Sequence, residues 1–241
     1  MDTIKFQLNA RRQPYGQGAD LSLLNESVGN EVLAFHQKFP DYRVTPLRKL
    51  EFLSQRLGLG SIHIKDEAQR FGLNAFKGLG GSYAMGKYLA ALLERDINTL
   101  SFAELNSPVI KARIKDIVFV TATDGNHGRG VAWAAEQLGL RAVVYMPKGS
   151  SPVRAQNIRR HGAECTITEL NYDDTVRLAA KTAREQGWVL LQDTAWQGYE
   201  QIPTWIMQGY MTLAVEIWQQ LAESGAPMPT HLFLQAGVGS F

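Results

Sequence analysis

The chain has 241 residues, enough for one or two domains with a sizeable hydrophobic core. Apolar residues make up 45% and charged residues 20%, a balance typical of a globular protein and unlike that of a disordered one. The net charge of +2 provides no basic field that would attract nucleic acid or a membrane surface. The single cysteine, Cys165, excludes an internal disulfide and multi-cysteine metal sites, and it fits a reducing compartment.

The sequence contains no recognisable targeting or membrane segment. Its first 16 residues lack the apolar stretch of a signal peptide. The longest apolar runs, such as residues 142–146, are far shorter than the roughly 20 residues that cross a bilayer. We therefore expect a cytoplasmic protein without a membrane partner.

The spacing of apolar residues predicts an α/β fold. Helical spacing predicts a helix within residues 21–38, and alternation predicts a strand at 61–65. Further along the chain the predicted strands are 117–121, 141–146, 164–170, 188–192 and 231–235, and the predicted helices are 126–138, 152–161, 173–186 and 202–222. Strands that alternate with helices of this length indicate βαβ units and a parallel sheet.

Ligands of parallel sheets bind at the carboxyl ends of the strands, so the loops after the predicted strands are candidate sites. Small residues together with polar or acidic residues occur in three such loops, at 123–128, 192–194 and 235–239. A fourth candidate segment, residues 74–81, precedes an apolar helix.

Lys77 in this fourth segment is a candidate nucleophile. Phe76 beside it is apolar, and the glycines within residues 78–81 leave space for a flat ligand. A lysine amine among apolar groups is suited to attack carbonyl carbon. Read by itself, Lys77 also fits an ordinary surface lysine.

Two acidic residues and one histidine follow the predicted strands. Asp124 suits a helix N-cap as well as a catalytic base, and Asp193 suits an ordinary loop carboxylate. If both lie near Lys77, the three residues form a general acid–base set. His127 fits either a site residue or a loop histidine bonded to the backbone. The five histidines lack metal-ligand spacing, so no metal site is predicted.

At these residues the chain resembles the fold-type II pyridoxal-phosphate (PLP) enzymes, and among them the diaminopropionate ammonia-lyase branch. The resemblance extends from about residue 35 to residue 239. It is carried by residues 65–77, 123–135, 145–150, 171–178, 192–196, 202–210 and 234–239. Asp124 stands where the wider superfamily usually has serine, which favours the diaminopropionate branch over the serine and threonine dehydratases.

The resemblance implies two domains and a role for each candidate residue. The large domain comprises residues 1–87 and 196–241, and the small domain comprises residues 88–195. By resemblance, Lys77 is the Schiff-base lysine, Asp124 a catalytic base and Asp193 a second acidic group near the substrate amines. Residues implied to hold the cofactor or the substrate are Asn126 at the cofactor's 3-hydroxyl, Thr123, Gly125 and His127 at the substrate carboxylate, and Gly237, Val238 and Gly239 at the phosphate.

The implied reaction is α,β-elimination of both enantiomers of 2,3-diaminopropionate to pyruvate and ammonia. PLP serves as the electron sink in such reactions. Acting on both enantiomers requires bases on both faces of the substrate, for which Lys77 and Asp124 are the expected pair. The implied partners are a small amino acid substrate and a second copy of the chain in a homodimer.

The resemblance stops in the glycine loop, because residues 239–241 end the chain where family members continue. We therefore expect a truncated chain with an incomplete large domain, which by itself holds little PLP and is inactive. Two alternatives stay open at this point. One is a lyase like the serine and threonine dehydratases, and the other is a non-catalytic protein that only binds a partner subunit.

Overall fold

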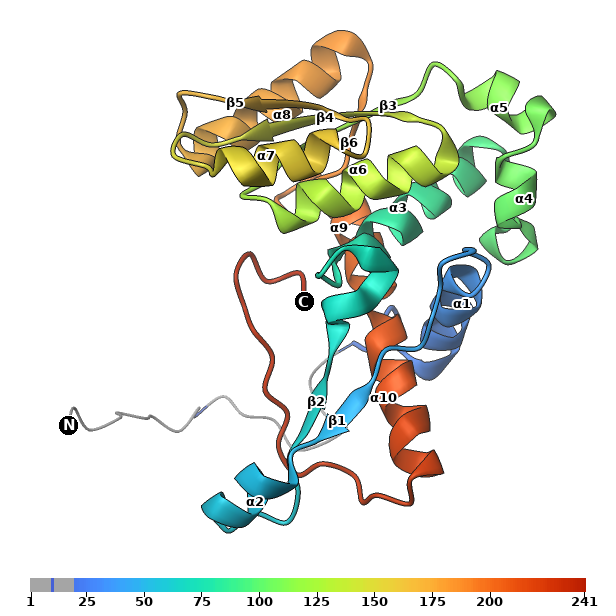
Figure 1. Cartoon of the computed structure of the whole chain (residues 1–241). Helices are drawn as coiled ribbons and strands as arrows, with labels where there is room; N and C mark the ends of the chain where they lie inside the picture. Colours follow the sequence, from blue (N-terminus) through green and yellow to red (C-terminus); the bar gives the residue numbers. More distant parts are fainter. Residues whose placement is uncertain (1–9, 11–19) are drawn as a thin grey trace.

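A four-stranded parallel sheet dominates one half of the computed structural model, which describes residue 10 and residues 20–241 (Figure 1). Its strands are β3 (Val118–Ala122), β4 (Arg141–Met146), β5 (Glu164–Ile167) and β6 (Val189–Leu190). They lie in the order β5-β4-β3-β6, and every neighbouring pair is parallel. The predicted α/β class is confirmed.

Helices cover both faces of this sheet, because alternate residues of each strand point to opposite sides. On one face, Phe119 and Val144 join a large hydrophobic core with α6 (Asn126–Leu138) and α7 (Pro152–Arg159). On the other face, Val118 and Val120 pack against α8 (Tyr172–Gln186).

The strand order creates a switch point between β3 and β6. The chain moves outward from β3 to β5 and then returns to place β6 on the opposite side of β3. The loops after β3 and β6 therefore lie side by side at the carboxyl end of the sheet, and a switch point of this kind is where open α/β sheets bind ligands.

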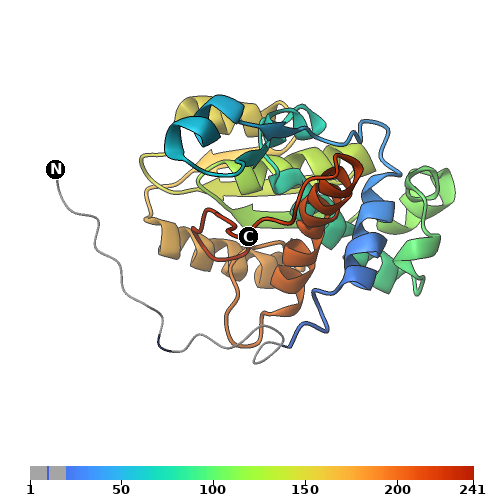
Figure 2. The same cartoon turned by 90° about the horizontal axis from the view of Figure 1, so that it is seen from below.

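The second half of the molecule is mainly helical and includes a small antiparallel hairpin. The hairpin strands are β1 (Leu47–Lys49) and β2 (His63–Lys65), with α2 (Glu51–Leu57) between them. The other elements in this half are α1 (Glu26–His36), the 3-10 helix η1 (Glu67–Gly72), α9 (Gln201–Gly209) and α10 (Met211–Glu223). Figure 2 shows α1 beside α10, the pair that forms its main helix contact.

Helix α3 (Lys77–Leu92) connects the two halves by packing against both α6 and α9. Three short helices, η2 (Ile97–Thr99), α4 (Phe102–Leu105) and α5 (Pro108–Ile114), lead from α3 to β3. The predicted domain boundary at residues 87 and 88 falls inside α3. The division into two domains remains a prediction, and residues 1–9 and 11–19 of the predicted large domain lie outside the described part.

The glycines of α3 allow close helix packing and do not leave room for a ligand, so that interpretation was wrong. A Cβ on Gly80 would lie 2.6 Å from the ring of Tyr210, and one on Gly78 would lie 2.8 Å from the side chain of Leu73. A Cβ on Gly81 would approach the backbone of Gly130 in α6 to 3.3 Å. The space beside these glycines is already filled by neighbouring helices.

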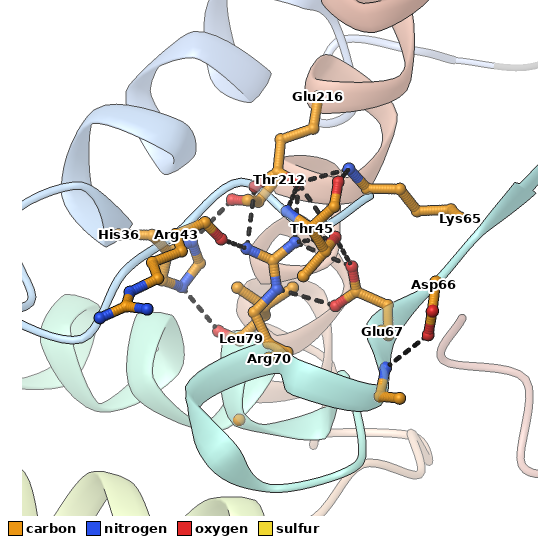
Figure 3. Close-up of polar contacts among 12 residues, drawn as sticks. His36, Arg43, Thr45, Lys65, Asp66, Glu67, Arg70, Leu79, Thr212 and Glu216 are labelled. Carbon is orange, nitrogen blue, oxygen red and sulfur yellow. Dashed lines mark hydrogen bonds and ion pairs between the residues drawn. The ribbon is translucent and has the colours of Figure 1, made fainter. Parts of the chain in front are cut away.

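A buried ionic cluster joins η1 and the hairpin to α10 (Figure 3). The guanidinium of Arg70 donates to both carboxylate oxygens of Glu216 at 2.8 Å and to both oxygens of Glu67 at 2.8 Å. Lys65 Nζ lies 2.6 Å from Glu216, and the Arg70 guanidinium also donates to the Thr45 hydroxyl. Since Arg70 and Glu216 are fully buried, each charge depends on its partners.

The strands predicted at 164–170 and 188–192 are shorter in the structure, as β5 and β6, and two further predicted elements differ in kind. Residues 231–235 form no strand, because no described strand lies beside them to complete a hydrogen-bonded ladder. The predicted helix 202–222 is two helices, α9 and α10, with a break at Tyr210. Within the described residues, no helix is both long enough and apolar enough to cross a membrane.

Candidate active site

A cavity of about 240 Å³ opens where α3 and α6 begin. It brings together every residue predicted to bind the cofactor: Lys77, Asn126, Gly237, Val238 and Gly239. The remaining lining comes from Phe76, Gln235, Ser240 and Phe241. The segment after α10 returns to the middle of the molecule to complete the cavity wall (Figure 1).

The backbone before Lys77 is held in an uncommon conformation. Phe71 and Asn74 have positive φ angles of 50° and 51°, which L-residues other than glycine seldom adopt. Stacking of the Phe71 ring on Trp133 of α6, with centroids 4.2 Å apart, fixes the first of these turns. Arg129 of α6 donates to the Leu73 carbonyl at 2.8 Å. Helix α6 thereby places Lys77 at the first position of α3.

The amine of Lys77 faces a carboxylate and two aromatic rings. Its Nζ atom donates to Asp193 Oδ2 at 3.0 Å. The same nitrogen lies 5.6 Å from the ring centroid of Phe76 and 5.3 Å from that of Tyr210, distances at which a cation is attracted to a ring face. The structure thus brings Lys77 and Asp193 together, although 116 positions separate them in the sequence.

Asp193 is held in place by the end of the sheet. The ladder between β3 and β6 continues through Leu191 N, which donates to Val120 O at 2.8 Å. The side-chain oxygen of Gln192 then accepts from Ala122 N at 3.0 Å and from the Thr121 hydroxyl at 3.1 Å. These bonds hold the loop after β6 against the last residues of β3, and they thereby fix the position of Asp193.

Asp193 is buried, and the nitrogen atoms around it keep it charged. Burial by itself would raise the pKa of this carboxyl. The facing side chains of His127 and Lys77 outweigh burial, so the pKa lies below its ordinary value. His127 Nδ1 lies 3.7 Å from Asp193 Oδ2, and burial lowers the pKa of its imidazole.

The loop after β3 is stabilised by a side chain predicted to hold substrate. The Thr123 hydroxyl accepts from Gly125 N at 2.9 Å and from Gly128 N at 3.1 Å, so it closes the loop internally. Asn126 and His127 begin α6, where an α-helix has no internal acceptors for its backbone N–H groups. The backbone of this loop, more than its buried side chains, is thus available to bind an anion.

Asp124 makes no hydrogen bond or ion pair with Lys77 or Asp193 within the described part of the chain. Its side chain is exposed, and its carbonyl accepts from Arg154 at 3.2 Å. Gly125 is the N-cap residue of α6, so the interpretation of Asp124 as the cap was wrong. The catalytic role of Asp124 remains a prediction.

Sequence reasoning missed two hydroxyl groups at the site. The hydroxyls of Tyr210 and Ser240 are buried and have no hydrogen-bond partner within the described part of the chain. Burial and the charge of Asp193 raise the pKa of Tyr210 well above its ordinary value, so the phenol stays neutral. Helical spacing could assign Tyr210 to a helix, but only the break after α9 turns it toward Lys77.

The residues around the cavity fit a flat aldehyde that carries a hydroxyl and a phosphate. Lys77 offers an amine, Asn126 offers an amide, and Ser240 offers an unpartnered hydroxyl. Among residue 10 and residues 20–241, no atom lies within 4 Å of the place where a Cβ would stand on Gly237 or Gly239, so their backbone can approach an anion closely. In the described residues, no group of three or more potential metal ligands occurs.

Comparisons with known proteins agree with this chemistry. The family described as "Pyridoxal-phosphate dependent enzyme" matches residues 38–241. The chain is 76% identical over 240 residues to the diaminopropionate ammonia-lyase of Salmonella typhimurium. This match covers 100% of this chain and 59% of that protein.

Solved structures of the Escherichia coli diaminopropionate ammonia lyase are also similar. The apo form is 53% identical with a TM-score of 0.86, and the match covers 91% of this chain and 59% of that one. The form in complex with an aminoacrylate-PLP azomethine reaction intermediate is 52% identical with a TM-score of 0.84, and the match covers 91% and 54%. The chain thus spans little more than half the length of these relatives.

Proposed function

The chain belongs to the family of pyridoxal-phosphate-dependent enzymes, and from this premise we propose that the protein eliminates ammonia from 2,3-diaminopropionate to give pyruvate and ammonia. The observation that carries this proposal is the Lys77–Asp193 pair, with its 3.0 Å contact, beside a cavity lined by the expected cofactor-binding residues. The high identity to diaminopropionate ammonia-lyases supports the choice of substrate.

We assign the cofactor to the residues that line the cavity. The amine of Lys77 would bind the aldehyde of pyridoxal phosphate covalently. The Asn126 amide would bond the ring hydroxyl, and the backbone N–H groups of residues 237–239 would bind the phosphate. When bound, the cofactor stabilises the negative charge that develops at the substrate's Cα.

Acidic residues of this chain would bind the second, cationic amine of the substrate. A diamino acid brings two cationic amines, and the ionised Asp193 supplies one buried negative charge for them. Lys77 and Asp124 would exchange the Cα proton on opposite faces of the substrate, which supports action on both enantiomers. The N-terminus of α6 would receive the substrate carboxylate.

Two further assignments concern the assembly and the location of the protein, and the first of them rests on the resemblance. We propose a homodimer as the assembly of the complete protein. The single cysteine supports a reducing, cytoplasmic location.

The proposal is tested by comparing substrates at saturating pyridoxal phosphate, on this chain joined to the remaining residues of its Salmonella typhimurium relative, because the 241 residues by themselves are expected to be inactive. The 2-oxo acid formed is measured with both enantiomers of 2,3-diaminopropionate, with L-serine and with L-threonine, and Lys77→Ala serves as the inactive control. Faster turnover of diaminopropionate is expected. Faster turnover of serine or threonine would identify a dehydratase. Cofactor bound at Lys77 without any turnover would support a non-catalytic protein that binds a partner subunit.

A further inference from the structure

His127 turns its side chain into the protein and toward Asp193. Its Nε2 atom lies 2.8 Å from the carbonyl oxygen of Leu191. Because a carbonyl can only accept, the hydrogen-bond network assigns a proton to Nε2. In the neutral imidazole, Nδ1 is then a bare lone pair. This nitrogen is buried and has no hydrogen-bond partner within the described residues.

One oxygen atom, Asp193 Oδ2, faces two nitrogen atoms. Lys77 Nζ donates to it at 3.0 Å, and His127 Nδ1 lies 3.7 Å from it. A lone pair that faces a carboxylate is repelled, whereas a protonated Nδ1 is attracted. The ammonium of Lys77 supplies the charge that Asp193 requires, so a second cation on His127 is not needed while that ammonium is present.

We propose that His127 is a positioning residue that receives a proton on Nδ1 when the Lys77 ammonium loses one. An N–H bond breaks at Lys77 Nζ and one forms at His127 Nδ1, so the summed charge of the three side chains does not change. Asp193 keeps a cationic partner throughout. The exchange is a property of these side chains, while its value for catalysis rests on the proposed function, because a lysine must be uncharged to attack an aldehyde.

The charges around His127 couple its pKa to the charge of Lys77. Burial lowers the pKa of His127, Asp193 opposes that effect, and the charge of Lys77 lowers the pKa further. The phenols near Asp193, Tyr172, Tyr199 and Tyr210, have raised pKa values because of burial and therefore stay neutral. Asp124, the other carboxylate at the end of the sheet, is exposed.

The test follows the imidazole of His127 by nitrogen NMR in the 241-residue chain, without cofactor or substrate. Replacing Lys77 by Met removes the competing cation, and we expect the His127 pKa to rise by about one unit or more. Adding Asp193→Asn to this variant should abolish the rise. The signals of His63 on β2 serve as the internal control.

Either of two results would overturn the proposal. One is an unchanged His127 titration in the Lys77→Met chain, and the other is a rise that persists with Asp193→Asn. Lys77→Gln is a second neutral replacement, to be used if the Met variant does not fold. Because neither cofactor nor substrate is present, a negative result here does not bear on the choice of substrate, which the turnover comparison decides separately.

Discussion

Asp193 is a buried carboxylate whose charge is balanced by the ammonium of Lys77, and this arrangement sets the chemistry available at the cavity. Lys77 donates to Oδ2 at 3.0 Å, and His127 contacts the same oxygen at 3.7 Å. A charge in such a place requires compensation, because burial alone favours the neutral form. The pair thus supplies both a nucleophile and a fixed negative charge within one hydrogen-bond length.

At the scale of single residues, replacing Asp124 tests whether it and Lys77 act as bases on opposite faces of the substrate. In the extended chain of the turnover comparison, Asp124→Asn keeps the shape of the side chain and removes its basic oxygen. If Asp124 acts on one face and Lys77 on the other, turnover of one enantiomer of 2,3-diaminopropionate should fall by about 10²–10⁴-fold. Turnover of the mirror image should change far less.

The measurement is kcat for each enantiomer, with Asp173→Asn as the matched control. Asp173 lies in the first turn of α8. Equal losses for both enantiomers would contradict the two-base assignment and leave Asp124 a positioning residue.

At the scale of elements, the close contact between α6 and α3 holds Lys77 in place. A Cβ on Gly130 would lie 2.8 Å from the backbone of Lys77 and Gly78. Backbone cannot move aside as a flexible side chain can. We therefore expect Gly130→Ala to lower the free energy of unfolding by about 1–3 kcal/mol.

Urea unfolding measures this loss, and Gly60→Ala is the control. Gly60 is exposed, and no atom of the residues that the structure describes lies within 4 Å of a Cβ built on it. A Gly130→Ala chain as stable as the Gly60→Ala chain would show that α6 does not restrain Lys77.

The ionic cluster on α10 predicts a pH-dependent stability. Burial favours the neutral form of Glu216, but Arg70 and Lys65 outweigh it and lower its pKa from 4.5 to about 2. A carboxyl with a lowered pKa stabilises the fold fully above pH 4.5, and this contribution is lost as the pH falls from about 4.5 toward 2. Glu216→Gln should cost about 3–5 kcal/mol at neutral pH, since it removes the carboxylate that Lys65 and the buried Arg70 share.

Unfolding in urea at several pH values checks this prediction. The difference in stability between the native chain and Glu216→Gln should shrink below pH 4.5. Glu223→Gln, at the exposed end of the same helix, should have little effect. A difference that is the same at pH 3 and pH 7 would mean that the charge of Glu216 does not stabilise the fold.

Elements with strong local patterns were predictable from the sequence. The spacing of apolar residues located β4 and α6 residue for residue, and glycine after α6 and α8 agrees with their left-handed C-caps. The short helices α4 and α5 escaped prediction because few residues carry their pattern. Residues 231–235 have the composition of a strand, but a strand also requires a partner, which the local sequence does not reveal.

The site was predictable in its residue types and less so in its geometry. Lys77 and Asp193 could be predicted because each lies in a distinctive sequence segment. The cavity then brings together the five residues expected to bind the cofactor. The inward turn of His127 depends on the carbonyl of Leu191, 64 residues away, and no local pattern encodes that contact. The glycines of α3 were misjudged for the same reason, because their neighbours come from α6 and α9.

At the scale of the whole molecule, the segment after α10 exposes a run of apolar side chains. Leu232, Phe233 and Leu234 are exposed, and Phe233 retains 91% of its accessible surface. Apolar residues that adjoin one another on a surface promote association. We expect this chain to bind a hydrophobic dye and to self-associate.

Sedimentation velocity and dye fluorescence test this expectation. Phe233→Ser should reduce both signals, whereas Val109→Ser, a change at another exposed apolar residue on α5, should not. The incomplete large domain also predicts exposed apolar surface on the predicted helix 202–222. There the only large hydrophobic residue that is exposed is Trp218, because α9 and α10 pack against α3 and α1. A monomer that binds no dye would contradict the expectation.

The cavity at the start of α3 is the feature on which the proposed function depends, and one measurement examines it directly. The chain is incubated with excess pyridoxal phosphate and reduced with borohydride, and mass spectrometry locates the pyridoxyl group. At this excess we predict the adduct on Lys77, with a lower occupancy in Asn126→Ala, because both residues line the cavity. An adduct on another lysine, or none on Lys77 at saturating cofactor, would contradict the assignment of this cavity as the cofactor site.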